Sequence, residues 1–136
     1  MRVLALDYGS ARCGCAVSDP TGTLATPIEH IERPGTRKGL VRVADLARER
    51  EVGRIVVGLP LGLSGHDTDQ TRETRVWADK LRDRVTPIPV ELYDERFTTR
   101  IASRSGPPAQ TRTSEDSRAA AVLLEDWLAR HGSERA

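Results

Sequence analysis

The stretch Val3-Leu4-Ala5-Leu6-Asp7-Tyr8-Gly9-Ser10 decides the fold, because it joins a wholly apolar run to a carboxylate and a glycine. Four consecutive apolar residues are typical of a strand that is buried on both faces. The glycine permits a sharp turn, and residues 13–18 predict a returning strand. A charge at the end of a buried strand costs free energy unless a cation or a donor meets it. Asp7 is therefore predicted to be a metal ligand, although aspartate is also common in turns.

The size and composition indicate one globular domain. At 136 residues and 15.0 kDa, we expect a single domain over residues 1–136, with a frayed tail from about residue 132. Charged residues are 30% and hydrophobic ones 38%, which argues against disorder. Aromatic residues are only 4%, which argues against a stacking platform for single-stranded nucleic acid. No membrane-length apolar run or signal-peptide layout is found, so we expect a cytoplasmic protein.

The rest of the chain predicts a mixed α/β fold. A third strand over residues 24–31 would complete an antiparallel meander, and Pro27 suits the edge of a sheet. The predicted elements that follow are helices at 36–51, 67–84 and 115–130, strands at 54–58 and 90–93, a helical turn at 98–103 and a basic, proline-rich loop at 104–114. Gly53 is expected to end the first helix. Because strands alternate with helices, we expect parallel neighbouring strands in one sheet that helices cover.

The two cysteines predict core positions rather than a metal site. Cys13 and Cys15 stand two apart on a predicted strand, so their side chains share one face and cannot easily form a disulfide. A single Cys-x-Cys pair without nearby histidines is a weak metal motif. We therefore expect both to be small buried residues.

Three acidic residues are expected at one edge of the sheet. Asp7 ends the first strand and Glu95 follows the last, and ligands of open α/β sheets bind beyond the carboxyl ends of the strands. Asp116 lies in the first turn of the last helix, four residues before Ala120 on its buried face. Convergent carboxylates repel one another unless a divalent metal lies among them, and oxygen ligands favour Mg²⁺ or Mn²⁺. Such a cluster suits phosphodiester hydrolysis with two metal ions.

Simpler interpretations of these acids stay open at this point. Asp116 loosely fits a helix-capping pattern with Thr113, and Glu95 could be a solvated charge paired with Arg96. Spacing alone does not show that the three acids meet. Nearby arginines could contact phosphates or form an ordinary solvated basic face. These arginines are Arg96, Arg100, Arg104, Arg112 and Arg118.

Four motifs resemble those of the YqgF (RuvX) family of Holliday junction resolvases, which has an RNase H-like fold. They are Leu6-Asp7-Tyr8-Gly9-Ser10 with Gly14 and Ser18-Asp19, Gly58-Leu59-Pro60-Leu61 with Gly65, Asp94-Glu95-Arg96-Phe97-Thr98-Thr99, and Asp116 with Ala119-Ala120 and Leu123-Leu124. The third motif is the most specific of the four. The match spans nearly the whole chain, in order, at a length typical of the family.

The resemblance implies a fold and a set of functional residues. The fold is a five-stranded mixed sheet flanked by helices, in which the antiparallel meander continues into parallel strands. The acids carried over are Asp7, Glu95 and Asp116, the same three that the strand ends indicate. The family is also implicated in processing the 5′ end of the 16S ribosomal RNA precursor, so pre-ribosomal particles are candidate partners. The loop at 104–114 departs from the family pattern, because it bears prolines and arginines in place of a lysine-rich run.

We therefore expect a nuclease that depends on Mg²⁺ or Mn²⁺ and acts on structured RNA or branched DNA. Precursor ribosomal RNA processing is the first choice, and cleavage of four-way DNA junctions is the alternative. Asp7 would bridge the metal ions, and Glu95 and Asp116 would complete the shell. The residues expected to contact substrate or to orient its phosphate are Gly9, Arg96, Thr98 and Thr99.

Two other classes of protein are alternatives. An Asp-x-Gly turn after a first strand also begins the actin-like ATPase fold, but that fold normally needs two such domains, so a nucleotide-binding module would be unusual. A catalytically silent RNA-binding protein would keep its biological effect after Asp7→Asn, whereas a nuclease would lose it. The sequence does not decide between a monomer and a homodimer, although two symmetric cuts in a junction favour a dimer.

Overall fold

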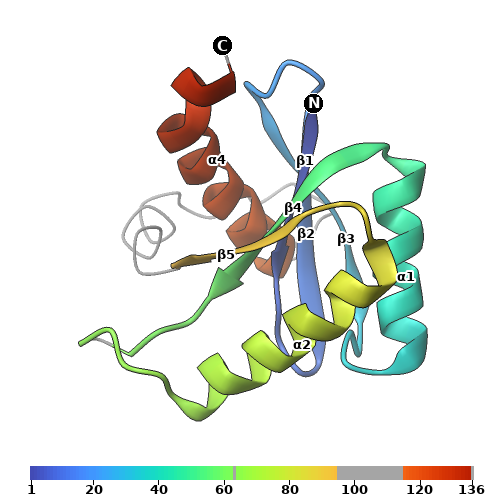
Figure 1. Ribbon diagram of the computed structural model, residues 1–136, viewed down its shortest axis with the longest axis vertical. Coiled ribbons are helices and arrows are strands. Elements are labelled where there is room, and N and C mark those ends of the chain that lie inside the picture. The colour runs from blue at the N-terminus through green and yellow to red at the C-terminus, as the bar shows by residue number, and fades with distance from the viewer. Residues whose placement is uncertain (63, 95–114, 136) are drawn as a thin grey trace.

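The computed structural model describes residues 1–62, 64–94 and 115–135, without the side chains of 132–135. The helical turn predicted at 98–103 and the loop predicted at 104–114 lie outside these ranges. Figure 1 shows a sheet flanked by helices. The strands are β1 (Arg2–Asp7), β2 (Arg12–Ser18), β3 (Ala25–Glu32), β4 (Val52–Leu59) and β5 (Val90–Asp94), and the helices are α1 (Arg37–Glu49), α2 (Asp69–Val85) and α4 (Glu115–Arg135).

The five strands form one mixed sheet in the order β3-β2-β1-β4-β5. β1 pairs antiparallel with β2 and parallel with β4, so it lies at the centre. β3 adds antiparallel to β2, and β5 adds parallel to β4. The predicted meander and the predicted parallel strands are confirmed. Pro27 lies on the edge strand β3, where a missing N–H costs no ladder hydrogen bond to a further strand.

The helices cover both faces of the sheet, and the alternation of side chains on β1 separates the two cores. Leu4 and Leu6 lie in one cluster with apolar residues of α1 and α2. Val3 and Ala5 lie in a second cluster with residues of α4. Figure 1 shows α1 and α2 on the opposite side of the sheet from α4. Because both faces are covered, β1 needs the continuous apolar run that its sequence has.

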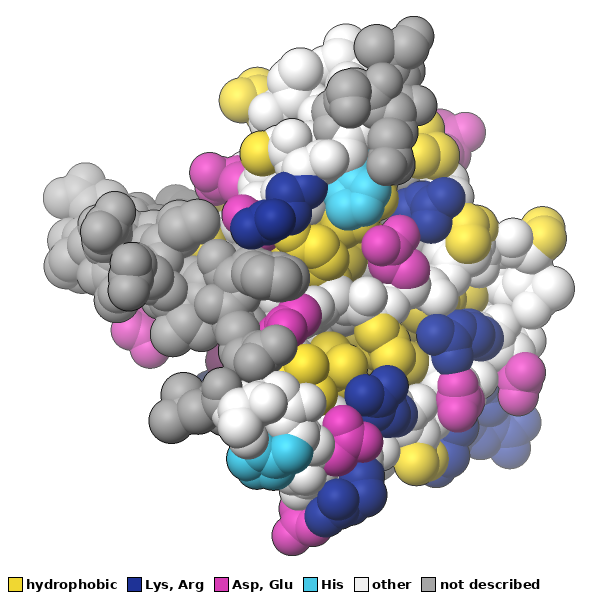
Figure 2. All heavy atoms as spheres, turned by 60° about the vertical axis from the view of Figure 1, so that its left-hand side comes forward, with side chains coloured by type: hydrophobic (Ala, Val, Ile, Leu, Met, Phe, Trp, Pro, Cys, Tyr) yellow, Lys and Arg dark blue, Asp and Glu magenta, His cyan; other side chains and the backbone are white. Residues whose placement is uncertain are grey.

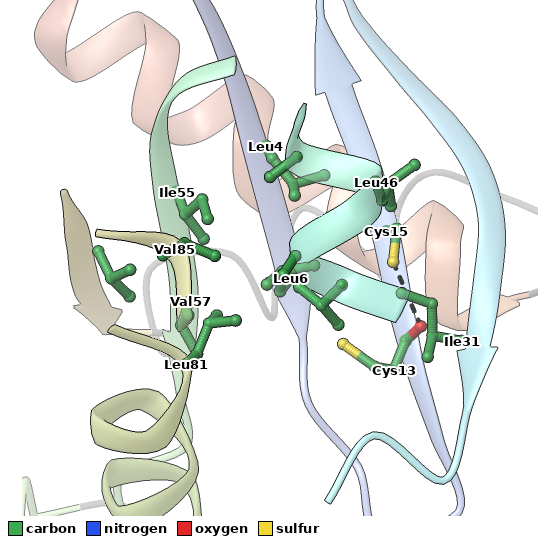
Figure 3. Packing of buried hydrophobic residues seen from close by; sticks show 14 of the residues in the cluster. Leu4, Leu6, Cys13, Cys15, Ile31, Leu46, Ile55, Val57, Leu81 and Val85 are labelled. Atoms are coloured by element: carbon green, nitrogen blue, oxygen red, sulfur yellow. Dashed lines mark hydrogen bonds between the residues drawn. The ribbon is translucent and has the colours of Figure 1, made fainter. Parts of the chain in front are cut away.

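Cys13 and Cys15 belong to the core beneath α1 and α2, as predicted. Figure 3 shows both side chains pointing from β2 to the side on which Leu6 of β1 and Leu46 of α1 lie. Both cysteines are fully buried free thiols. The Cys15 thiol donates a hydrogen bond to the carbonyl oxygen of Cys13, with the two atoms 3.6 Å apart. They pack as small apolar residues.

The first helix ends earlier than the glycine rule predicted. α1 stops at Glu49, and Glu51 adopts a left-handed backbone conformation with φ of 54°. Gly53, which was expected to end the helix, lies inside β4 instead. The chain therefore turns two residues before the glycine, because the neighbouring strand β1 recruits the backbone from Val52 onward into its ladder.

The last helix is longer than predicted. The sequence predicted a helix over residues 115–130, but α4 continues to Arg135. The ring of His131 stacks on Trp127 with centroids 4.3 Å apart, and its Nδ1 lies 2.9 Å from the Trp127 carbonyl oxygen. Packing on a buried tryptophan thus extends the helix by more than one turn. Even so, α4 and the other helices of the described chain lack the apolar length needed to cross a membrane.

Candidate active site

Asp7 is placed by the end of β1. It is the last residue of that strand and is half-buried. Val3 and Ala5 pack toward α4, so the two-residue period of a strand places Asp7 on the same face. Its ladder partner on β2 is Gly14. The carboxylate therefore lies at the carboxyl end of the central strand, on the side that α4 covers.

Gly14 lets the start of α4 come into contact with β2. A Cβ at this position would lie 1.9 Å from the carbonyl oxygen of Asp116 and 2.7 Å from the amide nitrogen of Ser117. The Ser117 hydroxyl accepts a hydrogen bond of 3.1 Å from the amide of Cys15, where the β2–β3 ladder is irregular. Because only glycine leaves this space, the backbone of α4 is fixed directly against the sheet.

Asp7 and Asp116 therefore flank Gly14, one from the neighbouring strand and one from the helix above. The Cys13 thiol, in the core on the opposite face of the sheet, lies within electrostatic range of both acids. Burial raises the pKa of this thiol, and its hydrogen bond with Cys15 and the negative charges of Asp7 and Asp116 raise it further. Asp7 and Asp116, more than a hundred positions apart in the chain, thus both lie beside the same residue of β2.

Arg12 contributes a cation that the sequence interpretation missed. Its Nε lies 3.1 Å from Oδ2 of Asp116, and the two side chains are 54% and 39% exposed. Gly14 and Ala16 face α4, so strand alternation places Arg12 on the α4 face as well. That alternation, applied to the start of β2, is the signal that could have found it. The acidic site therefore has its own counter-charge, open to solvent.

Gly9 lies in the turn between β1 and β2. A Cβ on Gly9 would lie 2.9 Å from the carbonyl oxygen of Arg12. This close approach gives a structural reason for the glycine, beside the predicted approach of a substrate. By allowing the tight turn, Gly9 positions the start of β2, from which Arg12 reaches Asp116.

Several of the predicted site residues lie outside the described residues, namely Glu95, Arg96, Thr98 and Thr99. Glu95 directly follows Asp94, the last residue of the parallel strand β5. Within residues 1–62, 64–94 and 115–135 there is no group of three acidic, histidine or cysteine side chains that could hold a metal ion. Of the three predicted acids, Asp7 and Asp116 lie among the described residues, both beside Gly14.

The surface charge around the sheet is mixed in sign. Figure 2 shows one face on which basic and acidic side chains are intermingled with exposed hydrophobic ones. The whole chain carries a net charge of only +1. Among the described side chains visible on that face, therefore, no broad basic patch is available to attract a polyanion from a distance.

The sheet order, with helices on both faces, is that of an RNase H-like fold, and solved structures agree. Thermus thermophilus RuvC in complex with a Holliday junction substrate has a TM-score of 0.63 and 17% sequence identity, over 98% of this chain and 97% of that one. A second Thermus thermophilus RuvC structure has a TM-score of 0.62 and 14% identity, over 97% of each chain. At such low identity the likeness concerns the fold.

The chain belongs to the RuvX family, described as Holliday junction resolvase, whose model matches residues 1–130. A relative from Mycobacteroides abscessus is 40% identical over 133 residues, which cover 93% of this chain and 80% of the relative. Relatives from Mycobacterium leprae and Mycobacterium tuberculosis are each 42% identical over 132 residues, covering 93% of this chain and 72% and 78% of theirs. All three carry the name "Putative pre-16S rRNA nuclease". The family predicted from the motifs is confirmed, and it supports a hydrolase that acts on nucleic acid.

Proposed function

We propose that this chain is a cytoplasmic, metal-dependent nuclease in which Asp7, Glu95 and Asp116 bind the metal and act as the catalytic acids. The arrangement around Gly14 carries the proposal. There a strand end and a helix start, distant in sequence, present carboxylates on one face of the sheet. Bringing like charges together costs free energy, and a bound cation offsets that cost.

The donor atoms fit a hard divalent cation such as Mg²⁺ or Mn²⁺. Carboxylate oxygens are the ligands that these ions prefer. Cys13 is the soft donor closest in the chain, but its buried side chain belongs to the core on the opposite face of the sheet, beneath α1 and α2. The chemistry of the site therefore favours oxygen coordination by Asp7, Glu95 and Asp116.

The bound ions would supply an activated water and would neutralise charge on the leaving oxygen. The chain's own part is to hold the carboxylates rigidly beside an open surface. The close contact at Gly14 and the hydrogen bond from Cys15 to Ser117 restrain the first turn of α4, which carries Asp116. Such preorganisation is what electrostatic catalysis requires. The residues assigned to substrate contacts are Gly9, Arg96, Thr98 and Thr99.

For the substrate, we favour the 5′ extension of the 16S ribosomal RNA precursor, met as structured RNA within pre-ribosomal particles. The name shared by the mycobacterial relatives supports this choice. A four-way DNA junction is the second candidate, supported by the family description. Symmetric cleavage of a junction would suit a homodimer, whereas processing of one RNA end would suit a monomer.

The test is a cleavage assay that offers a precursor RNA with its 5′ extension and a synthetic four-way DNA junction, each with Mg²⁺ and with Mn²⁺. We expect cleavage of the RNA, its loss on chelation, and a loss of at least about 100-fold in Asp7→Asn and Glu95→Gln. The control is Asp45→Asn, which removes an exposed carboxylate of α1 on the other face of the sheet and should cut like the wild type.

The outcomes separate the candidate functions. Cleavage of the junction alone would make the chain a resolvase. If neither substrate is cut, or if the Asp7 and Glu95 variants cut as well as the wild type, the metal-carboxylate mechanism fails and a binding module becomes the better description. Circular dichroism of each variant would show that lost activity does not reflect lost folding.

A further inference from the structure

Arg12 forms an ion pair with the carboxylate of Asp116, which the proposed function assigns to metal binding. Its Nε contacts Oδ2 of Asp116 at 3.1 Å. A guanidinium and a divalent cation repel each other, so both cannot hold this oxygen at full strength. If the site binds metal, the ion pair between Arg12 and Asp116 must weaken or break.

Arg12 has the hydrogen-bonding capacity for a second partner. A guanidinium has five N–H donors in a planar fork, and within the described chain Asp116 is its ion-pair partner. Glu32, the ladder partner of Arg12 on β3, has its pKa lowered by the hydrogen bond with His30, whose Nε2 lies 3.0 Å from Oε1, and by the charges of His30, Arg12 and Arg33. The Arg12 side chain is also 54% exposed, so an incoming ligand can reach it.

The backbone of Arg12 is fixed, whereas its side chain is half-exposed and held by the ion pair with Asp116. The Arg12 carbonyl oxygen lies under Gly9, where a Cβ would be only 2.9 Å away, and the residue begins the ladder of β2. A change of partner would therefore need only rotation about side-chain bonds. It would leave the sheet and the first turn of α4 unchanged.

We propose that Arg12 exchanges Asp116 for a phosphate oxygen of the nucleic acid when a divalent ion binds, and so serves as a substrate-binding residue of this site. The inference rests on the proposed function. In the metal-free protein Arg12 neutralises Asp116, and in the loaded protein its charge meets the phosphate beside the scissile bond. Arginine suits this step because its fork binds phosphate through paired, charge-assisted hydrogen bonds.

The proposal predicts two effects of opposite sign when the Arg12 charge is removed. Metal binding should improve, because a competing cation is lost from Asp116. Nucleic-acid binding should weaken, because a phosphate contact is lost. Removing an arginine with a merely structural role at the surface would not strengthen metal binding and weaken nucleic-acid binding at the same time.

The first measurement is the affinity for Mn²⁺ of the free protein, by isothermal titration calorimetry without nucleic acid. We expect Arg12→Gln to bind Mn²⁺ about fivefold or more tightly than the wild type, and Arg12→Lys to resemble the wild type. The matched control is Arg42→Gln, which breaks an exposed ion pair with Glu49 on α1, on the opposite face of the sheet. That variant should leave Mn²⁺ affinity unchanged.

The second measurement is the salt dependence of binding to the precursor RNA and to the DNA junction, in Ca²⁺ under conditions checked to give no cleavage. In Arg12→Gln the slope of log affinity against log salt should become shallower by about 0.7 to 0.9, the contribution of one phosphate contact. Arg12→Lys should keep most of the slope, and Arg42→Gln should keep all of it.

The results distinguish this inference from the function on which it rests. Tighter Mn²⁺ binding with an unchanged salt slope would make Arg12 only a counter-ion of Asp116 and would overturn the proposal. Unchanged Mn²⁺ affinity would overturn it as well. Should the wild type neither bind Mn²⁺ nor cleave either substrate, the proposed nuclease function itself would be wrong.

Discussion

Two aspartates at opposite ends of the β1–β2 hairpin are held in different ways. Asp19 follows β2, and its Oδ1 accepts hydrogen bonds of 2.8 Å from the backbone amides of Thr23 and Leu24, while its Oδ2 accepts one from the Thr21 hydroxyl. All these donors belong to one turn. Asp116 lies at the other end, and its ion-pair partner Arg12 comes from a distant part of the chain.

This difference distinguishes Asp19, a carboxylate with a structural role, from Asp116, a carboxylate that is available to bind a ligand. Hydrogen bonds from Leu24, Thr21 and Thr23 hold the pKa of Asp19 well below its usual range, so that it stays ionised and fixes its turn. Two of the donors of Asp19 are backbone amides of its own turn, which cannot leave without unfolding that turn. Asp116 is balanced by a half-exposed side chain that can turn away, which is the condition that a ligand-binding carboxylate needs.

Gly14→Ala tests whether the position of Asp116 depends on the contact between α4 and β2. The added Cβ would lie 1.9 Å from a backbone carbonyl oxygen, so the helix must move. We expect a loss of about 3 kcal/mol or more in the free energy of unfolding, measured with urea. In the control, Gly35→Ala, the Cβ would meet only the Tyr8 hydroxyl at 3.3 Å, and the loss should stay below about 1 kcal/mol. Equal losses in both variants would contradict the special role of Gly14.

Asp116→Asn and Asp19→Asn should affect different properties. We expect Asp116→Asn to lower kcat/KM for the cleaved substrate by about 100-fold, because the proposed metal ligand loses its charge. Asp19→Asn should leave kcat/KM unchanged and lower the unfolding midpoint, because its turn loses a charged acceptor. Steady-state cleavage and thermal unfolding of both variants would measure this, and a loss of activity in Asp19→Asn would break the comparison.

Ser117→Ala and Ser18→Ala make a matched pair, because each removes a hydroxyl that caps an amide of the β1–β2 hairpin. Each buried hydroxyl accepts a hydrogen bond from a strand amide, from Cys15 at 3.1 Å and from Val3 at 2.8 Å respectively. Either change leaves a buried N–H unpaired and should cost about 1 to 3 kcal/mol in urea unfolding. Only Ser117→Ala should also weaken Mn²⁺ binding, since Ser117 restrains the turn that carries Asp116. Equal metal affinity in both variants would argue against that restraint.

The pH dependence of the unfolding free energy should reveal how much the charge of Asp19 stabilises its turn. Because the pKa of Asp19 is lower in the folded protein than in the unfolded chain, its stabilisation is complete above about pH 5 and is lost as the pH falls below about 4 toward the folded pKa. The difference in unfolding free energy between the wild type and Asp19→Asn should therefore shrink as the pH is lowered from 7 to 3. A difference that stays constant over this range would show that the charge of Asp19 contributes nothing.

Much of the fold could be predicted because its signals are local. The apolar run of β1, the proline of the edge strand β3 and the alternation of strands with helices indicated the mixed sheet. The burial of Cys13 and Cys15 followed from their spacing on a strand. The helix ends were predicted less well. The end of α1 depends on pairing of Val52 with β1, a partner distant in the chain, whereas the contact of His131 with Trp127 is an i,i+4 pair that the sequence interpretation overlooked.

The candidate site was also predictable from the sequence only in part. The sequence by itself determined which residues could carry chemistry, since Asp7, Glu95 and Asp116 stand at strand and helix ends in family motifs. Only the tertiary structure decided that Asp7 and Asp116 flank Gly14 and that Arg12 meets Asp116. The amide of Cys15 and the hydroxyl of Ser117, 102 positions apart, form one hydrogen bond. Contacts of that separation depend on how whole layers pack, and spacing along the chain does not encode them.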